Sequence, residues 1–192
     1  MGFSLDEALA VAQKAAQVGA EAIAAGYRDR DLSVRHKGLI DLVTQYDLSS
    51  ERAIRAMVGE AFPSHGFLAE EEGLKEANPQ NPVWVVDPLD GTTNYVHRHP
   101  FFAVSVALAT PGPNGSLEPA VGVVHAPILR ERYWAVRGQG AYGQSLGEVD
   151  SPPVPLKVSP TAEMVEALVN TGFPYDAHER VKELVAPFER VL

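Results

Sequence analysis

The hydrophobic and polar positions of the chain first predict three helices. A capping box over Ser4–Glu7 precedes apolar residues at helical spacing, which predicts a long helix from Leu5 to about Ala25. A second helix is predicted from Asp47 through Ala61, where Pro63 ends it. A third apolar stripe, over His178–Leu192, has the same helical spacing and contains a proline that would kink it.

Extended stretches occupy most of the chain between these helices. Phe102–Thr110 alternates apolar and polar residues, as expected of a strand with one buried face. Short turns joining successive strands indicate an antiparallel sheet with helices on one side, which is an α+β fold. The predicted strands are Leu32–Arg35, Phe67–Glu71, Val83–Val86, Phe102–Thr110, Pro119–Ala126, Glu131–Arg137 and Ala167–Thr171.

A proline-rich stretch, Ser151–Pro160, marks one candidate boundary. It predicts an N-terminal α+β domain over residues 1–150 and the beginning of a second α/β domain over residues 151–192. The last apolar stripe reaches the final residue without a helix stop signal. We therefore expect the chain to be part of a longer protein.

Composition and charge narrow the function classes. The 192 residues are 45% hydrophobic and 21% charged, as in ordinary globular proteins, and include no Cys, which excludes disulfides and thiolate chemistry. A net charge of −9 and a pI near 5.1 argue against nucleic acid as a partner. There is no apolar run long enough to span a bilayer and no signal-peptide pattern. The sequence predicts a cytoplasmic protein without a membrane partner.

The candidate chemistry is concentrated in the run Asp87–Thr93, Asp-Pro-Leu-Asp-Gly-Thr-Thr, which follows the apolar strand Val83–Val86. The run places two carboxylates, Asp87 and Asp90, beside a turn and the predicted start of a helix. Carboxylates bind hard cations and a helix N-terminus binds anions. Such a site suits a phosphate bridged to Mg²⁺, although Asp-x-x-Asp-Gly is also common in surface turns.

A second acidic cluster, Glu70–Glu72, follows the apolar pair Phe67-Leu68. If both clusters lie at the ends of neighbouring strands, they converge on one point. Their like charges would then repel each other unless a cation lay between them.

Two other patterns are rejected. Gly138–Gly143 spells G-x-G-x-x-G after a strand, but prolines rather than a helix follow it, so the glycines are interpreted as a turn or bulge and not as a dinucleotide site. His97 and His99 could begin a zinc site, but no third ligand lies nearby at zinc spacing.

The chain resembles the inositol monophosphatase family over nearly its whole length. The resemblance rests on Phe67–Glu71, Trp84–Asn94, Phe101–Ser105 and flanking motifs, namely Lys37, Asp41–Thr44 with Asp47, Gly138-x-Gly140-Ala141 and Thr171–Pro174. It implies the sugar-phosphatase fold, a layered sandwich of an antiparallel sheet with paired helices followed by a second α/β domain. It also implies a Mg²⁺-dependent, lithium-sensitive phosphomonoesterase.

The same resemblance implies two or three Mg²⁺ ions per site. Glu70, Asp87 and the carbonyl of Leu89 would hold the first ion, and Asp87 and Asp90 the second. Family members continue with a Trp-Asp motif whose Asp is a further metal ligand, and this sequence has no counterpart of it.

Catalytic roles follow from the resemblance as well. Glu70 and Thr92 would orient the attacking water, and Asp47 would pair with Thr92 to polarise that water. The residue pattern alone leaves a second interpretation open, in which Asp47 is simply the N-cap of the second helix.

Substrate contacts are implied for Asp90, for the backbone N–H groups of Gly91 and Thr92, and for Lys37 on a mobile loop. The substrate would be inositol monophosphate or a related sugar phosphate, held by a homodimer of the kind typical of the family. Alternatives are the same chemistry on fructose 1,6-bisphosphate, a nucleotide 3′-phosphate, NADP or histidinol phosphate, or a non-catalytic metal-binding or regulatory module.

Overall fold

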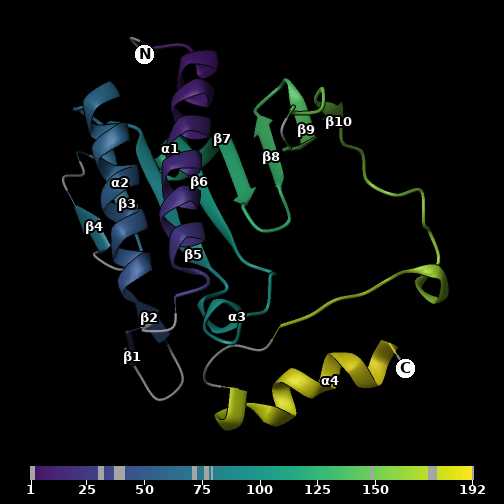
Figure 1. Ribbon diagram of the computed structural model, residues 1–192. Helices are drawn as coiled ribbons and strands as arrows, with labels where there is room; N and C mark the ends of the chain where they lie inside the picture. The colour runs from purple at the N-terminus through teal and green to yellow at the C-terminus, as the bar shows by residue number, and fades with distance from the viewer. Residues whose placement is uncertain are drawn as a thin grey trace.

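The computed structural model describes residues 3–29, 33–36, 42–70, 73–75, 78, 80–147, 149–172 and 177–191. Helices α1 and α2 lie side by side on one face of an eight-stranded sheet (Figure 1), so the α+β layered fold is confirmed. The helices are α1 (Leu5–Gly26), α2 (Gln45–Ala61), α3 (Thr92–Val96) and α4 (Val181–Val191). The strands are β1 (Val34–His36), β2 (Leu42–Thr44), β3 (Gly66–Ala69), β4 (Gly73–Lys75), β5 (Val83–Asp90), β6 (Ala103–Pro111), β7 (Leu117–Ala126), β8 (Glu131–Val136), β9 (Gly140–Ser145) and β10 (Val154–Pro155).

The two long helices form where their spacing predicts. In α1 the Ser4 side chain accepts from the Glu7 backbone N–H, and the Glu7 side chain accepts from the Ser4 backbone, which is the expected capping box. Helix α2 begins at Gln45 rather than at the predicted Asp47, and its N-cap is Thr44.

The sheet has the order β10-β9-β8-β7-β6-β5-β3-β4. The described pairs within it are antiparallel, as predicted, except that β3 and β5 are parallel. Parallel neighbours need a crossover connection rather than a tight turn. Residues 70–82 provide that connection and contain β4, which the sequence pattern does not predict.

The predictions for two segments of the sheet need correction. Val83–Val86 was expected to end at Asp87, but β5 continues to Asp90 through an irregularity in its pairing with β6. The G-x-G-x-x-G run was expected to be a turn or bulge, but only its beginning is a turn. From Gly140 onward it forms β9, because its backbone pairs along the full length of β8.

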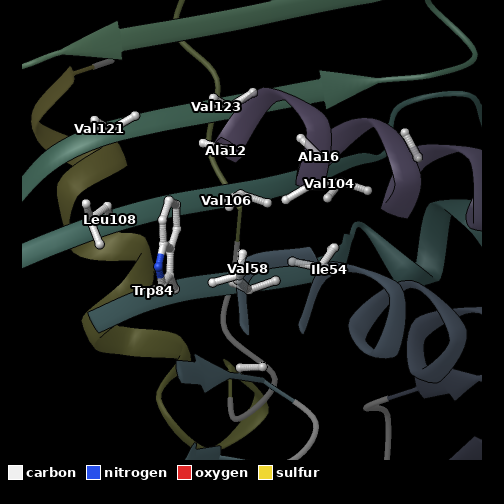
Figure 2. Packing of buried hydrophobic residues seen from close by; sticks show 14 of the residues in the cluster. Ala12, Ala16, Ile54, Val58, Trp84, Val104, Val106, Leu108, Val121 and Val123 are labelled. Carbon is white, nitrogen blue, oxygen red and sulfur yellow. The ribbon is translucent and has the colours of Figure 1, made fainter. Parts of the chain in front are cut away.

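The core lies between the helix pair and the central strands. Small residues of α1, such as Ala12 and Ala16, face the sheet, and Ile54 and Val58 of α2 pack beside them (Figure 2). Alternate residues of the strands complete the cluster: Trp84, Val86, Val104, Val106, Leu108, Val121 and Val123. The period-two pattern of the sequence therefore corresponds to the face that α1 and α2 cover.

After β10, the chain makes little further contact with the sheet. Every residue from 152 to 172 is exposed, and the strand predicted over Ala167–Thr171 is wrong, since this stretch has no regular structure. A strand needs a neighbour for its backbone hydrogen bonds, and the described residues offer none here. Helix α4 forms within the predicted helical stripe, with Pro187 inside it. The domain division at residue 150 stays a prediction.

Membrane insertion is not indicated by the helices. Within the described residues, no helix combines the length and apolar character needed to cross a bilayer.

Close packing of α1 against α2 depends on Gly19. A Cβ atom at this position would lie 2.7 Å from Ile54 Cδ1 and 2.8 Å from Ser50 Oγ, well inside van der Waals contact. Both neighbours are buried, so neither can move away freely. Gly59 in α2 is a natural comparison, because it is exposed and a Cβ there would meet nothing within 4 Å.

We expect Gly19→Ala and Gly59→Ala to change stability in opposite directions. Gly19→Ala should lower the free energy of unfolding by about 1–3 kcal/mol through overpacking. Gly59→Ala should raise it by about 0.5–1 kcal/mol, because alanine favours a helix interior. Urea unfolding followed by circular dichroism measures both values. Equal effects of the two substitutions would contradict the close contact between the helices.

Candidate active site

An irregularity in β5 brings Asp87 and Asp90 to the same side of the sheet. Asp87 pairs with Ser105 of β6 and Asp90 with Ala103, so three steps along β5 correspond to two steps along β6. In a regular strand, residues three apart point to opposite faces. The extra residue, a β-bulge at Pro88–Leu89, restores a common side for the two carboxylates. Proline is tolerated at such a bulge, where no ladder hydrogen bond is needed.

The parallel pairing of β3 and β5 adds Glu70 to this edge. Ala69 is in register with Val86, so the next residues, Glu70 just after β3 and Asp87 within β5, lie at the same level of the sheet. Asp87 is half-buried, whereas Glu70 and Asp90 are exposed. The structure thus brings the two acidic clusters together at residues 70 and 87, while Glu71 and Glu72 lie outside the described residues.

Burial and neighbouring charge act together on Asp87. Desolvation raises the pKa of its carboxyl most, and the negative charges of Glu70 and Asp90 raise it further, to about 7. The hydrogen bond that its Oδ1 accepts from the Leu89 backbone N–H at 3.1 Å acts in the opposite direction and lowers the pKa. The acids are therefore close enough to repel each other. This environment favours either a proton on Asp87 or a cation beside it.

Asp47 connects α2 to the helix that begins at Thr92. Its side chain is only 1% exposed, and its Oδ2 accepts from the Thr44 backbone N–H at 2.9 Å and from Thr44 Oγ1 at 2.5 Å. Its Oδ1 lies 3.2 Å from Thr92 Oγ1, which is also 3.0 Å from the Leu89 carbonyl oxygen. Burial raises the pKa of Asp47, and the hydrogen bonds from Thr44 and Thr92 oppose that rise.

The N-cap interpretation of Asp47 is therefore wrong in detail. Thr44 is the N-cap, and Asp47 is the third helical residue of a capping box, so one carboxylate both stabilises the helix start and contacts Thr92. No role for Thr44 was predicted from the sequence. The pattern Thr-x-x-Asp before an apolar helix could have identified it.

Gly91 permits the sharp change of direction between β5 and α3. Its φ is +90°, and a Cβ atom would lie 3.0 Å from the Phe101 carbonyl oxygen, so both backbone angle and space favour glycine. Helix α3 is then fixed by Tyr95, which is fully buried and donates from its hydroxyl to the Ile23 carbonyl of α1 at 2.7 Å.

A further contact, absent from the sequence analysis, holds the bulge from α2. Ser50 Oγ donates to the Pro88 carbonyl oxygen at 2.8 Å, and Ser50 is fully buried. A serine within a helical pattern carries no signal of such a distant partner, so sequence reasoning could not find it. The hydrogen bond fills an acceptor that the irregular pairing of β5 would leave without a strand partner.

The other predicted site residues can also be placed. Leu89 is buried in the core, so its backbone rather than its side chain is available at the site. Lys37 lies outside the described residues. In the described part of the chain, no group of three or more His, Asp or Glu side chains is already arranged to hold a metal ion.

The donor set nevertheless suits a hard divalent cation. It consists of oxygen atoms only, from carboxylates that repel one another and from the Leu89 carbonyl, which matches the ligands of Mg²⁺ and Ca²⁺. A cation between the acids would remove their mutual repulsion. The nearby Thr92–Asp47 pair adds a hydroxyl polarised by a buried carboxylate.

Comparison with known proteins identifies the family. The sequence model of the inositol monophosphatase family matches residues 4–191. The chain belongs to the inositol monophosphatase family. It is 39% identical over 171 residues to inositol monophosphatase 3 of Solanum lycopersicum, covering 88% of this chain and 59% of that protein. It is 37% identical over 168 residues to Nus factor SuhB of Pasteurella multocida, covering 87% and 58%.

The fold agrees with a solved member of the family. The structure of inositol monophosphatase from Anabaena (Nostoc) sp. PCC 7120 superposes with a TM-score of 0.73 at 32% identity, covering 91% of this chain and 58% of that one. The chain thus spans less than two thirds of the length of these relatives. The similarity confirms the predicted family, while the roles of individual site residues stay predictions.

The raised pKa of Asp87 leads to a prediction for metal-free protein. A folded-state pKa of about 7, above that of an unfolded carboxyl, means that the folded state binds the extra proton between about pH 4 and 7. The contribution of Asp87 to stability is therefore lost as pH rises through this window. Asp87→Asn should become more stable than the wild type as pH rises, with the difference levelling off above pH 7.

Urea unfolding in EDTA at a series of pH values tests this directly. Adding Mg²⁺ to the wild type should flatten its pH dependence, because a cation favours the ionised carboxylate. A stability difference between the two proteins that is constant with pH would show that Asp87 is not held in a repelling environment.

Proposed function

We propose that this chain carries the metal and phosphate site of a phosphomonoesterase that hydrolyses inositol monophosphate or a related sugar phosphate. The observation that supports this most directly is the position of Asp87. The bulge in β5 and the parallel β3–β5 register place it between Asp90 and Glu70, and the Thr92–Asp47 pair lies beside them. Family membership adds the reaction class.

Divalent cations would be held by Glu70, Asp87, Asp90 and the Leu89 carbonyl. We expect Mg²⁺, because the ligands are oxygen atoms and the negative charges of Glu70 and Asp90 raise the pKa of the Asp87 carboxyl. The number expected from the family resemblance is two or three ions per site. Bound cations supply an activated water and neutralise charge on the phosphate.

Thr92 and Asp47 would orient and deprotonate the water. When the Thr92 hydroxyl donates its hydrogen bond to Asp47, the lone pairs of the hydroxyl oxygen can accept a hydrogen bond from water. Burial raises the pKa of Asp47, which increases its tendency to accept a proton as the water attacks. Glu70, exposed at the same edge, would accept a hydrogen bond from the other O–H of that water, and this second hydrogen stays on the attacking oxygen.

Phosphate oxygens would contact the backbone at the turn after β5. The N–H groups of Gly91 and Thr92 are the proposed donors, and the positive φ of Gly91 sets their direction. Asp90 is proposed to face the substrate, and Lys37 to approach the phosphate. The substrate alternatives remain fructose 1,6-bisphosphate, a nucleotide 3′-phosphate, NADP and histidinol phosphate. We expect the protein to act in the cytoplasm as a homodimer.

A second candidate function is a non-catalytic, metal-binding regulatory module. The observation that favours it is the name of several relatives: proteins called Nus factor SuhB are 34–37% identical to this chain. Both candidates use the same cation site. Turnover of a phosphomonoester distinguishes them.

Phosphate release by the 192-residue chain tests the proposal, with inositol 1-phosphate and fructose 1,6-bisphosphate compared in the presence and absence of Mg²⁺. Calorimetric Mg²⁺ titration measures the cation site without requiring turnover. Mg²⁺ binding without release of phosphate from either substrate would favour the regulatory module. Absence of both would refute the site itself.

Asp90→Asn should reduce Mg²⁺-dependent phosphate release by at least about a hundredfold, because it removes a proposed ligand rather than a group that only orients one. Asp6→Asn is the charge-matched control, since Asp6 lies in the first turn of α1, at the end of that helix opposite α3 (Figure 1). It should leave the rate within about twofold of the wild type. A near-normal rate for Asp90→Asn would remove Asp90 from the cation site.

Thr92→Ala should lower kcat by about 10²–10⁴-fold, the usual contribution of assisted proton transfer. The neighbouring Thr93 is exposed, so Thr93→Ala makes the same chemical change without affecting the Asp47 contact and should retain activity. Steady-state kinetics of the two variants measures the difference. Equal kcat values would exclude Thr92 from the mechanism.

A further inference from the structure

A cavity of about 440 Å³ lies between the second half of α1, the β7–β8 hairpin and the loop after β9. None of its lining residues belongs to the proposed phosphatase site. Five of its lining side chains are titratable. These are Glu21 of α1, His125 of β7, Arg130 of the hairpin turn, Arg132 of β8 and Asp150 after β9. The volume suits a small molecule.

Two of these side chains have unfilled hydrogen-bonding capacity. His125 is 8% exposed, and its Nδ1 has no partner among the described residues. Arg132, directly opposite on β8, donates from Nη2 to Gln144 Oε1 at 2.9 Å, while its buried Nε has no partner in the described part of the chain. Buried polar atoms without partners are costly and uncommon in folded proteins. Both residues line the cavity, so the unpaired atoms lie within its wall.

The charges around the cavity are balanced but not paired. Arg130 and Arg132 are opposed by Glu21 and Asp150, yet within the described residues no ion pair of 4 Å or less joins the two signs. The acids have other neighbours: Glu21 accepts from Gln17 Nε2 at 3.0 Å, and Asp150 from the Gly147 backbone N–H at 3.3 Å.

We propose that this cavity binds a small zwitterion of the α-amino acid class, with its carboxylate at the Arg132 guanidinium and its ammonium group between Glu21 and Asp150. A ligand with only a negative charge would be attracted by the arginines but repelled by the two acids. A ligand with only a positive charge would be attracted by the acids but repelled by the arginines. A ligand carrying both charges bridges the two signs across the cavity. Arginine and carboxylate also match in geometry.

His125 fits the same ligand. Burial, and then the positive charge of Arg132, lower the pKa of its imidazole to about 4, so it is neutral at pH 7. A neutral imidazole adds no charge to the balanced cavity and can accept a hydrogen bond from an ammonium group. Glu21 and Asp150 act on His125 in the opposite direction, which places both acids near it.

Binding can be measured without any enzymatic turnover. The 192-residue chain is titrated by calorimetry with each of the twenty common L-amino acids, and with acetate and methylammonium as single-charge controls. We expect saturable binding of at least one amino acid and weaker or undetectable binding of both controls. Absence of saturable binding by every amino acid, or equally tight binding of acetate, would overturn the proposal.

Three variants locate the binding in this cavity. Arg132→Met and the exposed change Glu21→Gln should each weaken amino acid binding by about tenfold or more, the effect of losing a charge-assisted hydrogen bond. Arg137→Met is the control. Arg137 lies directly after β8 and pairs with Glu118 outside the cavity, so this variant also loses one positive charge but should bind the amino acid like the wild type.

Glu21→Gln keeps the test valid if Arg132→Met fails to fold, because Glu21 is on the surface of α1. Undiminished affinity in Glu21→Gln would show that any binding occurs elsewhere. Because the readout is binding, the result is independent of whether the phosphatase proposal holds.

Discussion

In a pleated strand, carboxylates three residues apart point to opposite faces, and the site at the end of β5 depends on removing that constraint. The bulge at Pro88–Leu89 does so, because Asp87 and Asp90 pair with residues only two apart on β6. The parallel β3 strand then delivers Glu70 to the same edge. Backbone pairing, rather than any attraction between side chains, holds these like charges together.

Holding like charges together has an electrostatic cost that the rest of the site reflects. Asp87 gains a proton readily, and its neighbours offer only oxygen donors, so the arrangement favours a hard cation. Asp47 differs from Asp87, since Thr44 and Thr92 satisfy its oxygens within the protein. The half-buried Asp87 and the buried Asp47 therefore lie in different environments, the first suited to a metal ion and the second to a hydroxyl group.

The sequence predicted the elements that follow a local period, and the motif residues within them. Helix α1, most of α2 and the strands β6, β7 and β8 lie close to their predicted ranges, whereas β5 continues beyond its predicted end to Asp90. The bulge was missed because pairing with β6 decides it. The strand predicted over Ala167–Thr171 was wrong because no segment among the described residues pairs with it. The contact of Ser50 with Pro88 also joins distant segments, so no local pattern indicates it.

The position of Ser50 makes the helix pair part of the site. Ser50 touches the space that Gly19 leaves open in α1 and, on its other side, holds the carbonyl of the bulge. A larger residue at position 19 would press on Ser50 as well as on Ile54, so a change in how α1 packs on α2 would be transmitted to the carbonyl between the two carboxylates.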